Sequence, residues 1–198
     1  MIISMSNIVC ITNRHLCKED FLTRIDHIAS YHPKAIILRE KDMTPEDYLE
    51  LASQVISICK KYNVKCILHS FSSVATSLKM NAIHLPLPLL RSMSKKERSS
   101  FLVLGASCHS VEEAKEAEAL GCSYIIVGHI FETDCKKGLP GRGLEFLQNV
   151  ISSVNITVYA IGGINETNIS QVLHTGADGA CLMSSLMSND NISQLMKK

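Results

Sequence analysis

A histidine follows an apolar stretch near the middle of the chain, where a strand is expected to end. Residues 124–127 are typical of a strand, and His129 stands two positions later, at the start of a loop rich in glycine, lysine and acidic residues. An imidazole titrates near neutral pH and can both accept and donate a proton. The pattern indicates proton-transfer chemistry, with a half-buried histidine hydrogen-bonded to loop backbone as the alternative.

Short β-rich runs alternate with helical patterns along the whole chain and would position this histidine. Strands are expected at residues 8–12, 35–38, 65–68, 82–85, 101–105, 124–128, 156–161 and 179–183, and a polar helix is expected at the C-terminus. Strands separated by helices imply right-handed crossovers and a parallel sheet. Eight such units predict a single α/β domain over residues 1–198, a closed (β/α)8 TIM barrel; a doubly wound open sheet is the alternative.

Composition narrows the class of protein. The 198 residues carry a formal net charge of +1, and basic residues are spread along the chain, which argues against a nucleic-acid surface. No apolar run has the length of a membrane span and no signal peptide is evident, so a cytoplasmic protein is expected. The eight cysteines form no CxxC pair. Cys135 lies in the polar loop, where a chance cysteine is favoured over a nucleophile.

In a barrel of this kind the site lies at the C-terminal ends of the strands. Glycines in the loop after the seventh strand would let backbone N–H groups approach a phosphate. Two serines follow the eighth strand, beside that loop. At the second exit, an arginine could clamp an anion or form a salt bridge to Glu40. The candidate site residues are Arg39, His69, Ser107, His129, Lys136, Gly162, Gly163, Ser184 and Ser185.

With these motifs placed, the chain resembles the thiamin phosphate synthase superfamily over nearly its whole length. The resemblance is carried by residues 11–12, 38–41, 107–114, 128–139 and 160–164. The run from Gly128 to Leu139 is similar to the TenI branch, whose characterised members are thiazole tautomerases. In the synthase branch the position of His129 is usually proline.

A second feature separates the two branches. Synthases carry Asn-Asp after the third strand and Gly-Gln-x-Asp after the fourth, and those aspartates hold the Mg²⁺ that neutralises a departing diphosphate. Here the corresponding stretches read Leu68-His69-Ser70 and His84-Leu85-Pro86-Leu87-Pro88, without a carboxylate. His69 stands where the tautomerase branch tends to have asparagine, so its role is open.

The resemblance therefore implies a thiazole tautomerase of thiamin biosynthesis, an isomerase that needs neither metal nor cofactor. Its substrate would be a phosphorylated carboxythiazole, with His129 as the acid/base and Gly162, Gly163, Ser184 and Ser185 around the phosphate. Arg39 would hold the substrate carboxylate and Lys136 would help to position an anionic group, with Ser107 and His69 as further substrate-binding residues. Two alternatives remain: a Mg²⁺-dependent thiamin phosphate synthase, and a non-catalytic TenI-type regulatory protein. A homo-oligomer is left open.

Overall fold

The chain folds as a closed parallel barrel. The computed structural model describes residues 4–133 and 136–188. Eight strands are hydrogen-bonded in sequence order around the barrel, which confirms the (β/α)8 fold and excludes the open sheet. The strands are β1 (Ile8–Ile11), β2 (Ala35–Leu38), β3 (Lys65–His69), β4 (Ala82–Pro86), β5 (Val103–Cys108), β6 (Tyr124–Gly128), β7 (Thr157–Ile161) and β8 (Gly179–Leu182).

Internal contacts divide the described chain into two compact units. The terminal unit comprises residues 4–83 and 182–188, and the central unit comprises residues 84–133 and 136–181. Nearly every strand residue in both units is buried. Such continuous apolar runs are typical of parallel strands covered by helices.

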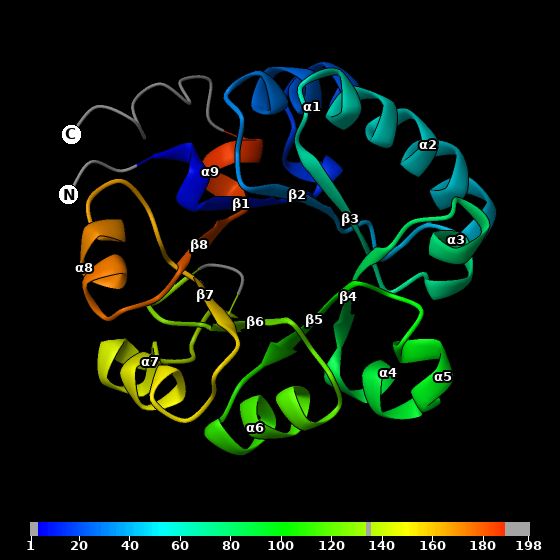
Figure 1. The fold of residues 1–198 in the computed structure, drawn as a ribbon. Helices are drawn as coiled ribbons and strands as arrows, with labels where there is room; N and C mark the ends of the chain where they lie inside the picture. Colours follow the sequence, from blue (N-terminus) through cyan, green and yellow to red (C-terminus); the bar gives the residue numbers. More distant parts are fainter. Residues whose placement is uncertain (1–3, 134–135, 189–198) are drawn as a thin grey trace. The chain divides into compact units, whose positions relative to one another are not determined.

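In the terminal unit, β1, β2 and β3 pair in parallel, with Ile36 opposite both Cys10 and Cys66. Helices α1 (Phe21–Ser30) and α2 (Pro45–Lys61) lie side by side outside these strands (Figure 1). The Thr44 hydroxyl accepts a hydrogen bond from the Asp47 N–H, and Pro45 opens helix α2. The shorter elements are η1 (Met5–Asn7), η2 (Arg14–Leu16), α3 (Ser72–Ser77) and α9 (Ser184–Met187).

In the central unit, β5, β6, β7 and β8 pair in parallel. The helices are α4 (Leu87–Ser92), α5 (Lys95–Arg98), α6 (Val111–Ala119), α7 (Gly143–Ile151) and α8 (Ile169–His174). Helix α4 was not expected from the sequence, and a capping box at Ser94 starts α5. The fifth strand extends to Cys108 rather than ending at Gly105, so Ser107 belongs to the strand itself.

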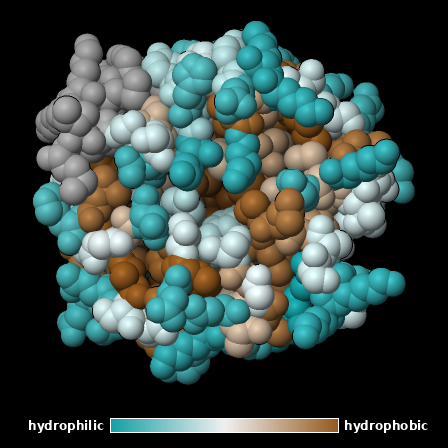
Figure 2. Space-filling view, viewed as in Figure 1, coloured by the Kyte–Doolittle hydropathy of each residue, from teal (hydrophilic) through white to brown (hydrophobic). Residues whose placement is uncertain are grey.

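Hydrophobic and hydrophilic residues are interspersed on the face shown in Figure 2. Within the described residues, no helix is long and apolar enough to cross a membrane. Cys135 and the helix expected at the C-terminus lie outside the described residues.

Candidate functional site

A buried carboxylate organises the ends of β1 and β2 in the terminal unit. The side chain of Glu40 is only 1% exposed and is ion-paired with Arg14, Nη1 to Oε2, at 3.2 Å. It also accepts hydrogen bonds from the Thr12 hydroxyl at 2.6 Å and from the Arg14 backbone N–H. The Arg14 guanidinium also donates two hydrogen bonds to Asp42, from Nη1 and Nη2, and this pairing holds the pKa of Asp42 well below its usual range. The charge of Glu40 is therefore compensated without Arg39.

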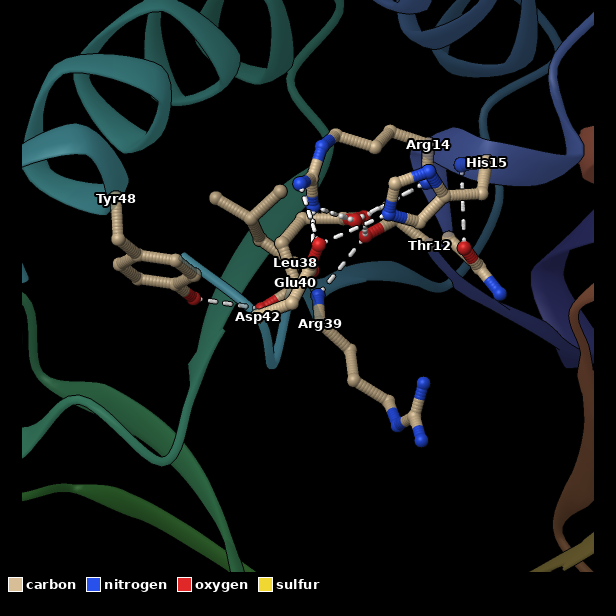
Figure 3. Close-up of polar contacts among 9 residues, drawn as sticks. Thr12, Arg14, His15, Leu38, Arg39, Glu40, Asp42 and Tyr48 are labelled. Atoms are coloured by element: carbon tan, nitrogen blue, oxygen red, sulfur yellow. Dashed lines mark hydrogen bonds and ion pairs between the residues drawn. The ribbon is translucent and has the colours of Figure 1, made fainter. Parts of the chain in front are cut away.

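This arrangement bears on the salt bridge to Glu40 that was considered for Arg39. The Arg39 backbone N–H donates to the Thr12 hydroxyl at 2.8 Å, which fixes the start of the side chain. Figure 3 shows the guanidinium extending away from the cluster of Arg14, Glu40 and Asp42. No acidic partner is found for that guanidinium anywhere in residues 4–133 or 136–188. Arg39 thus presents an uncompensated, planar cation at the end of β2, suited to a phosphate or carboxylate.

His69 lies at the end of β3 and is buried. Burial, reinforced by the charges of Arg39 and Lys41, lowers the pKa of His69 to about 3, so the imidazole is neutral near pH 7. Its Nδ1 lies 2.8 Å from the Ser70 hydroxyl, and its backbone N–H donates to the Tyr48 hydroxyl at 3.0 Å. His69 therefore adds hydrogen-bonding capacity but no charge to this end of the unit.

The central unit contains a second polar group, around His84 of β4. Its Nε2 lies 2.9 Å from the Ser107 hydroxyl of β5, and its Nδ1 lies 3.1 Å from the Tyr124 hydroxyl of β6. His84 and Tyr124 are buried, whereas Ser107 is half-buried near the end of its strand. Gly105 makes room for the tyrosine, because a Cβ there would lie 2.0 Å from the ring carbon Cζ. Side chains from three neighbouring strands thus form a hydrogen-bonded chain that runs from buried Tyr124 through His84 to the Ser107 hydroxyl.

The turn after β7 requires both of its glycines. Gly162 and Gly163 have φ values of 102° and 64°, in the left-handed region that favours glycine. A Cβ on Gly162 would lie 2.3 Å from the Cβ of His129. The Gly162 carbonyl accepts from the Phe131 N–H and the Gly163 carbonyl accepts from the Asn168 amide. With the carbonyls occupied, the N–H of Gly163 finds no acceptor among the described residues and is available to an anion.

His129 leaves β6 as expected, but its imidazole contacts loop backbone. The ring is half-buried, and Nε2 lies 3.3 Å from the carbonyl oxygen of Leu139, to which it can only donate. A hydrogen bond from His129 to loop backbone is what the sequence analysis gave as the alternative to proton transfer. Lys136 is exposed and lines a hollow with Glu132 and Leu139 on the same loop. Nearby, His109 links β5 to β6 through its Nδ1, 3.0 Å from the Gly128 carbonyl.

The expected phosphate residues are distributed over both units. Gly162 and Gly163 belong to the central unit, whereas Ser184 and Ser185 begin α9 in the terminal unit. Ser184 is exposed and Ser185 is half-buried. Each pair therefore occupies the strand exit at which it was expected.

A Mg²⁺ site of the kind that the resemblance assigns to synthases does not fit these residues. The β3 exit carries His69 and Ser70, and β4 ends at Pro86. In residues 4–133 and 136–188, no group of three or more His, Cys, Asp or Glu side chains could hold a metal ion. Glu40 and Asp42, the acids that follow β2, are already engaged by Arg14.

Sequence reasoning missed His84 and Tyr124 as site residues, and Thr12 and Arg14 as residues that position Arg39. A lone histidine inside the apolar strand Ala82–Pro86 was the available signal for the first pair. The partners of His84 lie 23 and 40 positions away, so only the fold brings them together.

Barrels of this class place ligand sites on the loops after their strands. The uncompensated arginine and the glycine turn are typical of barrel proteins that bind small anionic ligands. The chain belongs to the family described as thiamine monophosphate synthase, whose match covers residues 8–186.

Named relatives agree with this family. Thiamine-phosphate synthase of Clostridium acetobutylicum is 34% identical over 188 residues, covering 92% of this chain and 87% of the relative. The protein of the same name from Fusobacterium nucleatum is 31% identical, covering 91% and 89%. Among solved structures, thiamine phosphate pyrophosphorylase from Pyrococcus furiosus has a TM-score of 0.83 and 28% identity, covering 98% of this chain and 93% of that one.

These matches confirm the superfamily and correct the predicted function. Relatives covering nearly the whole chain are named as synthases, so the prediction of a cofactor-independent thiazole tautomerase, an isomerase, is wrong. That prediction rested on the His129 loop and on the missing carboxylates after β3 and β4, whereas the relatives match over nearly the whole chain. With the tautomerase, the assigned role of His129 as its proton carrier is also withdrawn.

Proposed function

We propose that this protein forms thiamine phosphate, coupling a pyrimidine diphosphate to a thiazole phosphate with release of diphosphate. The names of its relatives support this proposal. The structural observation that carries it is the free guanidinium of Arg39, released from Glu40 because Arg14 and Thr12 satisfy that carboxylate.

Both substrates of this reaction are anionic, and each unit offers groups for an anion. In the terminal unit, Arg39 would bind the diphosphate, with Lys41 as an additional cation and His69 as a neutral neighbour. In the central unit, the N–H of Gly163 and the hydroxyl of Ser107 would bind phosphate oxygens. Charge-assisted hydrogen bonds from a planar guanidinium are short and strong, which suits a leaving group that gains charge as its bond to carbon breaks.

A coupling assay tests the proposal. Purified protein is incubated with both substrates, with and without added Mg²⁺, and thiamine phosphate and diphosphate are quantified. Equal amounts of the two products are expected. Arg39→Met should raise the KM for the pyrimidine diphosphate about tenfold or more, since a hydrogen bond to a charged group contributes about 1.5–3 kcal/mol.

Arg91→Met is the matched control. Arg91 is an exposed arginine on α4 that donates two hydrogen bonds to Glu116, and its loss should leave coupling unchanged. Absence of product under all conditions would contradict the proposal. Binding of thiazole phosphate without any coupling would instead favour a non-catalytic protein.

A further inference from the structure

Tyr124, His84 and Ser107 form a chain of hydrogen bonds whose direction can be deduced. Tyr124 is buried, and burial raises the pKa of its phenol well above the usual value, so its hydroxyl remains protonated. That proton needs an acceptor, because a buried donor without one is destabilising. Nδ1 of His84 is the one acceptor that lies within hydrogen-bond distance of this hydroxyl among the described residues.

The donation from Tyr124 determines which nitrogen of His84 carries the hydrogen. If Nδ1 accepts, the neutral imidazole carries its hydrogen on Nε2. Nε2 then donates to the Ser107 hydroxyl oxygen at 2.9 Å. The opposite tautomer would direct Nδ1–H at the tyrosine and leave the buried phenolic hydrogen without an acceptor.

The state of Ser107 follows from that tautomer. Its oxygen already accepts from His84, so its own hydrogen is left to donate elsewhere. No acceptor for that hydrogen is present among residues 4–133 and 136–188. Ser107 is half-buried near the C-terminal end of β5, where ligands of barrel proteins bind.

We propose that Tyr124 and His84 are positioning residues that hold the Ser107 hydroxyl as a hydrogen-bond donor to an anionic oxygen of the substrate. A phosphate oxygen carries no hydrogen and is the complementary acceptor. The identity of that oxygen rests on the proposed function, whereas the tautomer of His84 does not.

The tautomer is measured first, in protein without substrate. Long-range ¹H–¹⁵N correlation spectra of ¹⁵N-histidine protein distinguish a protonated Nε2 from a protonated Nδ1, and His84→Gln assigns the signal. A protonated Nε2 with an unprotonated Nδ1 is expected near pH 7. Tyr124→Phe should shift or average this signal. A protonated Nδ1 in the unmodified protein would overturn the proposal, whatever the protein binds.

Affinity for thiazole phosphate, measured by calorimetry, tests the second step. Ser107→Ala should weaken binding about tenfold or more, because it removes a hydrogen bond to a charged group. Tyr124→Phe should weaken binding by a smaller factor, and should have no further effect once Ser107 is alanine. Independent losses in the double variant would indicate a merely structural role for Tyr124 and overturn the proposal.

Tyr159→Phe is the matched control. Tyr159 is a buried tyrosine on β7 whose ring contacts that of Tyr124 edge-on at 5.9 Å between centroids. The Tyr159→Phe variant loses a phenolic oxygen from the same region as Tyr124→Phe. Its affinity for thiazole phosphate and its His84 signal should both stay unchanged. If the unmodified protein binds no thiazole phosphate, the proposed function fails, while the tautomer still decides whether Tyr124 orients His84.

Discussion

His69 makes the stability of this protein depend on pH in a defined window. The folded-state pKa is lowered from 6.5 to about 3, chiefly by burial and then by Arg39 and Lys41. Below pH 6.5 the unfolded chain binds a proton at this histidine and the folded protein does not, so acid favours unfolding. This contribution is absent above pH 6.5 and grows as the pH falls toward 3. Each pH unit in the window amounts to about 1.4 kcal/mol.

At pH 5.0, about 1.5 units below the ordinary value, the loss from His69 is about 2 kcal/mol. Urea unfolding followed by circular dichroism at pH 7.0 and 5.0 measures it, with His69→Gln as the comparison. Contributions from the other titrating groups cancel when the change in the free energy of unfolding is compared between the two proteins. The unmodified protein should lose about 2 kcal/mol more than His69→Gln over this interval.

His27→Gln serves as the control, because His27 is exposed on α1. Its stability should fall with pH in parallel with that of the unmodified protein. Parallel curves for His69→Gln as well would refute the reasoning, since they would mean that His69 is protonated as readily in the folded protein as in the unfolded chain.

Three substitutions test the packing around the candidate site by urea unfolding. Arg14→Met should lower the free energy of unfolding by about 2–3 kcal/mol. This loss is smaller than for a fully buried pair because the Arg14 side chain is 29% exposed. Adding Glu40→Gln should restore part of the loss. Gly162→Ala should lose about 2 kcal/mol or more through its positive φ and its collision with His129, and no loss would mean that the turn relaxes freely. Tyr48→Phe should lose about 1–3 kcal/mol, because two backbone groups lose their partner, and an unchanged midpoint would contradict the hydrogen bonds assigned to it.

The alternation of strands and helices could be predicted because apolar runs and helix caps are local signals. The end of β5 could not, since residues 105–108 include glycine, alanine and serine and have weak strand propensity. Pairing with β6 extends the strand there, with Ser107 opposite Ile126. Helix α4 was missed because it starts directly after Pro86, within a run of leucine and proline.

Within the candidate site, residue types were more predictable than their partners. Arg39 could be recognised from its position after a strand, but whether Glu40 would neutralise it depended on Arg14, which lies 26 positions away in the chain. The tautomerase prediction failed for a related reason. Two local features, the His129 loop and the missing carboxylates after the third and fourth strands, were compared with one branch of a superfamily, whereas the relatives match over nearly the whole chain.

Tyr48 holds the backbone at one end of the terminal unit without using the side chains of the candidate site. From α2 its hydroxyl donates to the Leu38 carbonyl at 2.6 Å and accepts from the His69 N–H at 3.0 Å, which ties the backbones of β2 and β3 together. The side chains that follow, Arg39 and Ser70, take no part in this tie. Mutation can therefore exchange the Arg39 side chain while the backbone that carries it stays in place. Such a division lets one scaffold acquire new ligand preferences through single substitutions, without first losing its fold.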